Sequence, residues 1–146
     1  DWVLLKNMDN AKTDNSHFYW QLNEKITCRY LKVRNLEVPD GKFAISGFRI
    51  FGKGQGLPPQ KPVFMSIKRD SLDRRTAYLR WTPLANTTGY VINYGSDTNK
   101  LYHSYMVYKD AHLTINGLNA NQEYFFTIEA FNENGITHND TIKQPK

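Results

Sequence analysis

The longest alternation of apolar and polar positions in this chain lies between residues 117 and 137. In it, Phe126, Ile128 and Ala130 share one parity, and the other parity includes Glu129 and Phe131. A period of two is typical of a half-buried strand. Because the even set is the more apolar, we expect it to face a core and the odd set to face solvent.

A turn before this strand adds a second signal. Leu118 lies six residues before Tyr124, and the polar residues Asn119, Asn121 and Gln122 lie between them. This arrangement predicts a tyrosine corner, in which the Tyr124 hydroxyl bonds back to the turn before its own strand. Tyrosine corners are typical of Greek-key β-sandwiches.

The second half of the chain carries about seven strand signals separated by turns rich in Asn, Asp and Gly, and the sequence therefore predicts an all-β sandwich. The expected strands are residues 63–68, 76–82, 89–94, 102–107, 113–115, 122–132 and 135–142. Within the second of them, Trp81 shares its parity with Ala77 and Leu79, so we expect it on the core face.

This half resembles a fibronectin type III domain between residues 62 and about 143. The likeness rests on Leu79-x-Trp81, on Gly89-Tyr90-Val91-Ile92-x-Tyr94, and on Leu118 with Tyr124. It implies structural roles for Trp81, Tyr90, Leu118 and Tyr124 in an immunoglobulin-like β-sandwich.

The first half also reads as β-structure, and no helical stripe competes with the strand pattern. Four strands are expected, at residues 2–5, 17–22, 28–36 and 43–51. In the last of them the apolar parity changes near Gly47, which predicts a β-bulge there. Cys28, the single cysteine, is expected to be a small buried hydrophobic residue.

Two segments of this half, CRYLKVRN at 28–35 and GKFAISGFRIFG at 41–52, resemble the C-terminal part of a discoidin-like (coagulation factor type C) jelly-roll sandwich. The resemblance implies that residues 1–52 are part of such a module and lack strand partners. Open strand edges favour pairing with another copy, giving a homodimer, or with the missing upstream half of the module.

Residues 53–62 combine Gly and Pro and read as a linker between the first module and residues 63–146. Their glycines do not form a phosphate-binding loop, because no helix follows and Pro58-Pro59 removes two backbone donors.

The order of the modules resembles the C-terminal accessory region of bacterial family 43 glycoside hydrolases, the β-xylosidases and arabinofuranosidases. The resemblance implies a non-catalytic region of a secreted, periplasmic or cell-surface bacterial enzyme. Its partners would be a catalytic domain and plant cell-wall polysaccharide, and its role polysaccharide degradation.

Composition agrees with a folded protein: 40 % of the 146 residues are hydrophobic and 14 % are aromatic. No apolar run reaches the roughly 20 residues of a membrane helix, and the start at Asp1 suggests a mature form or a piece of something longer. The net charge of +5 permits weak attraction to anionic polymers, but Lys and Arg are scattered, so we expect no nucleic-acid binding.

The sequence shows no pattern typical of a catalytic or metal-binding site. The carboxylates lie singly or in turns, without the paired arrangement that glycoside hydrolysis needs. The four histidines lack metal-ligand spacing, and we expect no catalytic residues, no metal and no cofactor.

Aromatic side chains are the one candidate for ligand recognition, because sugar rings stack on exposed aromatic faces. In a strand, Phe18-Tyr19-Trp20 would turn at least one ring outward, and of Tyr102, Tyr105 and Tyr108 two are expected to pack and one to be exposed. The carbohydrate-binding candidates are Trp20, Tyr19 and Tyr105. Three hypotheses stay open: a structural spacer, a carbohydrate-binding module, and a surface for anionic polymers.

Overall fold

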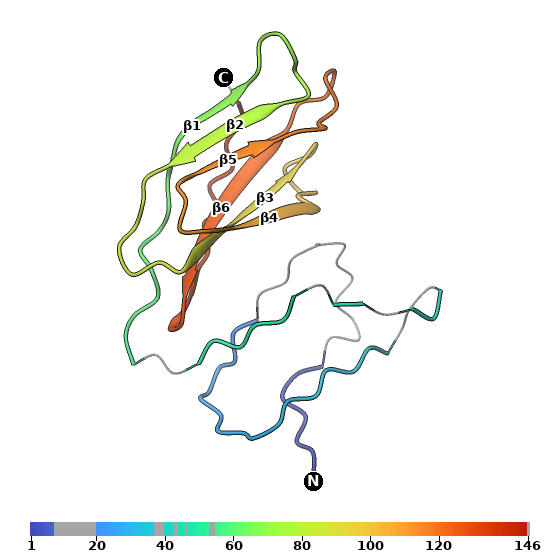
Figure 1. Cartoon of the computed structure of the whole chain (residues 1–146), viewed down its shortest axis with the longest axis vertical. Helices are drawn as coiled ribbons and strands as arrows, with labels where there is room; N and C mark the ends of the chain where they lie inside the picture. Colours follow the sequence, from blue (N-terminus) through green and yellow to red (C-terminus); the bar gives the residue numbers. More distant parts are fainter. Residues whose placement is uncertain (8–19, 37–39, 43, 46, 53–54, 146) are drawn as a thin grey trace.

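The computed structural model describes residues 1–7, 20–36, 40–42, 44–45, 47–52 and 55–145 (Figure 1). In this part of the chain seven antiparallel strands form a sandwich of two sheets. The three-stranded sheet has the order β1 (Phe64–Arg69), β2 (Ala77–Trp81), β5 (His112–Ile115). The four-stranded sheet has the order β4 (His103–Tyr108), β3 (Gly89–Gly95), β6 (Phe125–Asn132), β7 (Gly135–Thr137). The predicted all-β sandwich is confirmed.

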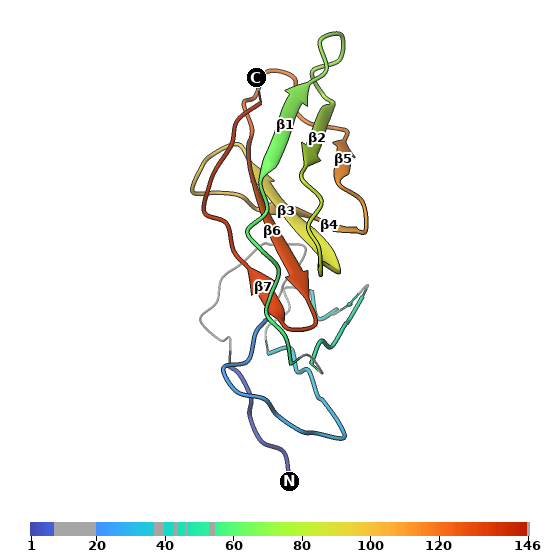
Figure 2. The same ribbon diagram turned by 90° about the vertical axis from the view of Figure 1, so that its left-hand side faces the viewer.

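The main core lies between the two sheets, which Figure 2 shows as separate layers. Trp81 is 1 % exposed and lies in its centre, with its ring edge-on to that of Tyr90 at a centroid distance of 5.3 Å. The even positions of β6 are fully buried here, as the alternation predicts: Phe126, Ile128 and Ala130. Apolar residues of β1, β2 and β5 cover them from the opposite sheet.

The turn between β3 and β4 depends on one glycine. A Cβ added to Gly95 would lie 1.9 Å from the carbonyl oxygen of Lys100. The backbone of Lys100 closes the turn by donating its N–H to the Asp97 carbonyl at 3.0 Å. Only a residue without a side chain fits the close approach of these two backbones.

The prediction that the odd positions of β6 face solvent is wrong for Phe131, which is fully buried. It forms a second apolar cluster with Val91 and Ile136 on the outer side of the four-stranded sheet. Phe51 packs against this cluster from outside the strands. Alternation predicts only which residues share a face, and here an additional segment covers the outer face as well.

The strands predicted in the first half are also wrong for the residues described there. No described residue before Phe64 belongs to a strand, and Gly47 therefore lies in no bulge. Cys28 is exposed and not buried. The strand-like pattern of these segments is real, but a strand is stable only when another strand pairs with it, and no described segment pairs with them.

The last predicted strand, 135–142, is shorter than expected, because β7 ends at Thr137. After it, Asn139 is buried, and the chain returns to the sheet only at Lys143, which forms an isolated bridge with Phe126. None of the described segments is a helix long and apolar enough to cross a membrane. The two ends of the chain lie at opposite ends of the long axis (Figure 1).

Candidate functional site

A segment of residues 56–62, which we name the strap, lies against the turn between β6 and β7. The backbone N–H of Gly56 donates to Oδ1 of Asn134 at 2.9 Å. The Leu57 carbonyl accepts from the side-chain amides of Asn134 at 3.2 Å and Asn132 at 3.1 Å. Figure 2 shows the segment running beside β7.

The strap continues along β7 through its proline carbonyls. The Thr137 hydroxyl donates to the carbonyl of Pro59, and the Asn139 amide donates to that of Pro62 at 2.8 Å. Both prolines are buried. Because proline has no N–H, the strap cannot add a full strand ladder to β7. Side-chain amides and a hydroxyl instead bind its carbonyl groups.

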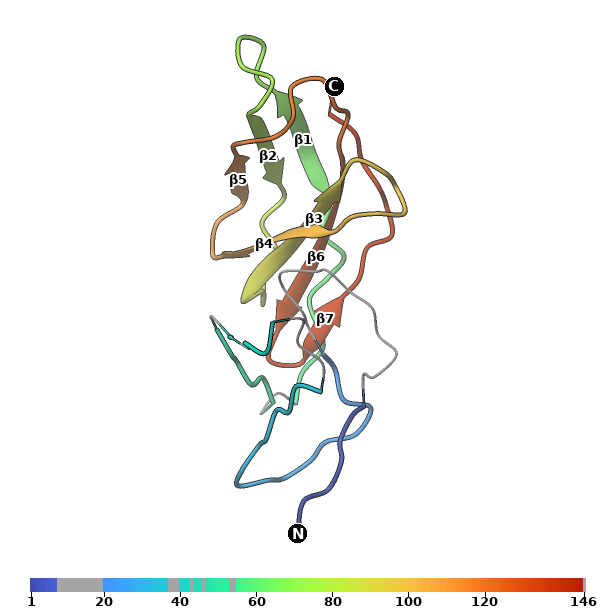
Figure 3. The ribbon, with the colours of Figure 1, turned by 90° about the vertical axis from the view of Figure 1, so that its right-hand side faces the viewer.

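Residues just before the strap cover the outer face of the four-stranded sheet. The Phe51 ring packs edge-on against that of Phe131 at a centroid distance of 5.4 Å. The Arg49 guanidinium lies 4.3 Å from the centre of the Tyr108 ring, a cation–π contact. Figure 3 shows the chain before the strap at this end of the sheet. We name the strap together with Arg49 and Phe51 the joint.

The Gly and Pro content predicts a linker at residues 53–62 that is flexible at first and then stiffened by its prolines, and the structure adds bonds that tie residues 56–62 to the domain. Five side-chain hydrogen bonds hold residues 56–62. The side chains that make them come from β6, from the turn between β6 and β7, from β7, and from Asn139 after β7. The sequence indicated Asn132 as the end of an expected strand and, with Asn134, as part of the turn after it, and Thr137 and Asn139 as strand residues.

The carbohydrate-binding candidates lie on different parts of the chain. Tyr105, on the edge strand β4, is 40 % exposed, and its ring stacks on Tyr94 at 6.1 Å with an interplanar angle of 13°. Tyr94 stacks in turn on buried Phe126 at 5.7 Å, so the Tyr105 ring is anchored to the core. Trp20 is 42 % exposed outside both sheets, with Lys6 Nζ 5.7 Å from its ring centre. Tyr19 lies outside the described residues.

The sequence predicts that two of the three tyrosines after Lys100 pack and one is exposed, but the structure shows the reverse. Tyr108 packs edge-on against Phe131 at a centroid distance of 5.8 Å, but Tyr102 and Tyr105 are both exposed. β4 is an edge strand with a single neighbour, β3. It therefore has less cover than a central strand, which leaves a second ring in solvent.

The four residues assigned structural roles lie in the main core or at its rim. Trp81, Tyr90 and Leu118 are buried. The Tyr90 hydroxyl accepts the backbone N–H of Leu84 at 2.9 Å. The Tyr124 hydroxyl accepts the backbone N–H of Asn119 at 3.2 Å, the bond back to the preceding turn that defines a tyrosine corner.

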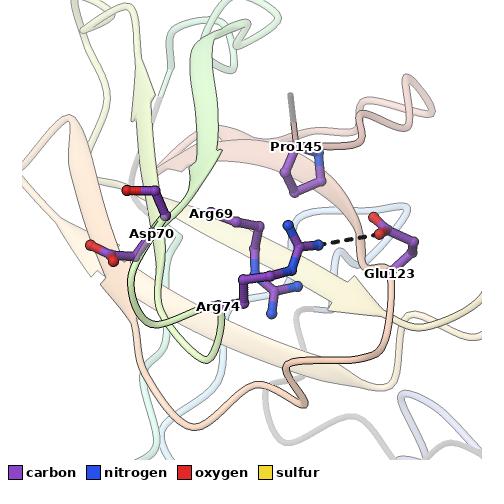
Figure 4. Close-up of a pocket in the computed structure, with 6 residues that line it drawn as sticks. Arg69, Asp70, Arg74, Glu123 and Pro145 are labelled. Atoms are coloured by element: carbon purple, nitrogen blue, oxygen red, sulfur yellow. Dashed lines mark hydrogen bonds and ion pairs between the residues drawn. The ribbon is translucent and has the colours of Figure 1, made fainter.

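A hollow of about 440 Å³ lies where the β1–β2 turn meets this corner (Figure 4), lined by Arg69, Asp70, Ser71, Arg74, Glu123 and Pro145. Arg69 donates to the carbonyls of Asn119 and Gln122, both at 3.1 Å. Arg74 pairs with Glu123 at 3.3 Å. The two guanidinium groups thus bind the corner turn, Arg69 through the two backbone carbonyls and Arg74 through Glu123.

Hydrogen bonds at the β1–β2 turn shift the pKa of several side chains. Asp70 accepts the backbone N–H groups of Asp73 and Leu72, both at 2.8 Å, and the Tyr78 hydroxyl at 3.0 Å. These bonds lower the pKa of Asp70, and the hydrogen bond to Asp70 raises the pKa of Tyr78. The arrangement fixes the turn; the carboxylates are not paired across a cleft as glycoside hydrolysis requires.

Metal ligands do not gather in the described part of the chain, where no group of three His, Cys, Asp or Glu side chains could hold an ion. His138 instead lies 2.6 Å from Glu129. His17 lies outside the described residues.

Comparison with known proteins agrees with this geometry. The fibronectin type III domain profile matches residues 54–143. The chain belongs to the fibronectin type III family. The resemblance inferred from Trp81, Tyr90 and Tyr124 is thereby confirmed, and the match includes the whole strap. Domains of this family are generally non-catalytic and often act as spacers or accessory modules.

Two solved fibronectin type III structures have the same fold at low identity. One, described as FN3tt mut, is 20 % identical, with 61 % of this chain and 93 % of that chain covered and a TM-score of 0.50. The other, a Fn3-like protein from Clostridium thermocellum, is 19 % identical, with 60 % and 94 % covered and a TM-score of 0.50. None of the curated proteins matches the sequence.

Proposed function

We propose that this chain is a non-catalytic accessory region of a secreted, polysaccharide-degrading glycoside hydrolase, in which the fibronectin type III domain is a spacer that orients the catalytic domain. The family 43 enzymes that the module order resembles place this region in a bacterial secreted, periplasmic or cell-surface protein. The observation that carries the proposal is the joint, because it fixes the direction in which the chain enters the domain.

The energetics of the joint favour a fixed orientation. A net contribution of about 0.5–1.5 kcal/mol is typical of one intramolecular hydrogen bond, and five such bonds hold the strap. A Gly-rich segment without such contacts would behave as a random coil. The chain enters near one end of the domain and leaves at the other (Figure 1), as a spacer requires.

The upstream half of the discoidin-like module is the proposed partner of residues 1–52, together with the catalytic domain. Tyr30, Val33 and Ile50 are large apolar or aromatic residues that are more than half exposed in these extended segments. Strands supplied by the upstream half would pair with them and cover these side chains. A second copy of the chain is the alternative strand donor, and it would be seen as a dimer in light scattering.

The orientation is tested by measuring a distance across the joint by spin labelling. Cys28→Ser removes the native thiol, and Ile50→Cys with Ser71→Cys places labels before the strap and at the far end of the domain. We expect one narrow distance distribution. Asn132→Ala combined with Asn139→Ala should broaden it, whereas Asn121→Ala, away from the strap, should not. A broad distribution in the parent chain would contradict the spacer role.

Carbohydrate binding is the second candidate, favoured by the anchored and exposed ring of Tyr105. A ring already fixed by packing loses little conformational entropy when a sugar stacks on it. Calorimetric titration with xylan, arabinan and arabinoxylan oligosaccharides distinguishes the two functions. The spacer predicts no binding, whereas the binding module predicts weak binding that Tyr105→Ala or Trp20→Ala abolishes and Tyr105→Phe retains.

A further inference from the structure

The outer side of the three-stranded sheet forms a surface that we name the basic face: Ser66, Lys68, Tyr78, Arg80, His112 and Thr114. The register places these side chains in two rows across the strands. One row is formed by Ser66, Arg80 and His112. The other is formed by Lys68, Tyr78 and Thr114. Figure 2 shows the three strands as one layer, whose second side is turned away from the core.

Three side chains of the basic face, two of them cationic, are exposed and make no ion pair in the described part of the chain. They are Lys68, Arg80 and His112. The neighbouring turn is different, because there Arg75 pairs with Asp73 at 2.9 Å. No outward position in the two rows is acidic. Basic side chains that are scattered in the sequence thus share one face of the fold, and the Asp70 carboxylate, which accepts the Tyr78 hydroxyl, borders this face.

Tyr78 provides an aromatic ring among these basic side chains. It is 45 % exposed, and its hydroxyl donates to Asp70, which fixes the ring. Lys68 is its direct partner on β1. Arg80 lies two residues along β2 on the same face. Cross-strand neighbours on one face of a sheet are about 5–8 Å apart, so one ligand can contact the ring and both cations.

We propose that the basic face binds a carboxylated polysaccharide. A pyranose ring stacks on Tyr78, and its carboxylate accepts charge-assisted hydrogen bonds from Lys68 and Arg80. A nucleic acid fits less well, because its binding depends on Lys and Arg side chains that neutralise several phosphates, and this face offers one lysine and one arginine. A flat sheet face suits an extended polymer. This role goes beyond the spacer function, which needs no ligand.

The test is affinity electrophoresis of the full chain in gels containing polygalacturonate, with neutral xylan and poly-glutamate gels as comparisons. We expect retardation by polygalacturonate that weakens as salt rises, and none by neutral xylan. Tyr78→Ala should weaken the affinity about tenfold, by analogy with the loss of an aromatic stacking platform. Tyr78→Phe, which keeps the ring, should retain it.

Matched charge variants locate the site. Lys68→Gln and Arg80→Gln should each reduce retardation, while Lys100→Gln, an exposed lysine on the β3–β4 turn, should not. Unchanged melting curves establish that the variants are folded. Absence of retardation by polygalacturonate, equal retardation by poly-glutamate, or equal effects of Lys68→Gln and Lys100→Gln would each overturn the proposal. The distance measurement across the joint does not depend on any of these results.

Discussion

The two tyrosine hydroxyls that bind backbone N–H groups should differ in their contribution to stability. Tyr90 is 4 % exposed, and its hydroxyl accepts the Leu84 N–H at 2.9 Å. Tyr90→Phe removes the hydroxyl and leaves the partly buried N–H of Leu84 without an acceptor, which costs about 1–3 kcal/mol. The bond between Tyr124 and Asn119 is longer, 3.2 Å, and lies near the surface. Water can replace it there, so Tyr124→Phe should cost only about 0.5–1.5 kcal/mol.

Thermal and urea unfolding measure this difference. For a domain of this size each kcal/mol lowers the melting temperature by about 4–8 °C, so the two variants should be resolved. Tyr105→Phe is the control, because the Tyr105 hydroxyl has no partner among the described residues, and its melting curve should not change. If Tyr124→Phe destabilises the chain as much as Tyr90→Phe, the distinction between a buried and a solvent-accessible bond is wrong for this domain.

Three further predictions concern the turns and the strap. Gly95→Ala should destabilise the domain by about 1–3 kcal/mol or more, because its Cβ would overlap the Lys100 carbonyl. Chemical denaturation measures this loss. Gly47→Ala is the control and should unfold like the parent chain, because nothing lies within 4 Å of its added Cβ. A chain beginning at Gln55 should be more stable than one beginning at Val63 by about 1–3 kcal/mol, since only the first keeps the strap and the entropy lost on ordering the strap offsets part of its hydrogen bonds. Equal melting temperatures of the two truncated chains would show that the strap adds nothing. The lowered pKa of Asp70 predicts a stability contribution present above its usual pKa of about 4 and lost as pH falls through the lower folded value. Asp70→Asn should therefore flatten the acid limb of the pH–stability curve, and an unchanged limb would contradict the assignment.

The sandwich could be predicted from the sequence because its determinants are local. Alternation placed Phe126 and Ile128 on the core face of β6, and the spacing of Leu118 and Tyr124 indicated the turn before it. Each of the seven expected strands overlaps an observed one. These signals depend on the period of a strand and on turn chemistry, which short segments carry by themselves.

The parts that were not predicted depend on contacts between residues far apart in the sequence. Asn132 bonds to Leu57, 75 positions earlier, and no periodicity in either segment indicates this pairing. The burial of Phe131 likewise includes a contact with Phe51, 80 positions earlier. In the first half the pattern indicated strands, but a pattern cannot supply the partner that a strand needs, and Cys28 is accordingly exposed. Local signals thus determine the sandwich, while its attachment to the preceding chain is determined by long-range contacts.

The strap also explains why the domain begins earlier than its first strand. β7 is an edge strand, and an uncovered edge favours pairing with other chains. A strap containing Pro58 and Pro59 covers this edge without becoming another strand, since proline cannot donate to a ladder. β7 ends at Thr137, and Asn139 turns inward to bind Pro62 at 2.8 Å. The last strand is therefore shortened where its side chains hold the strap, and the family match beginning at residue 54 agrees with a domain that includes it.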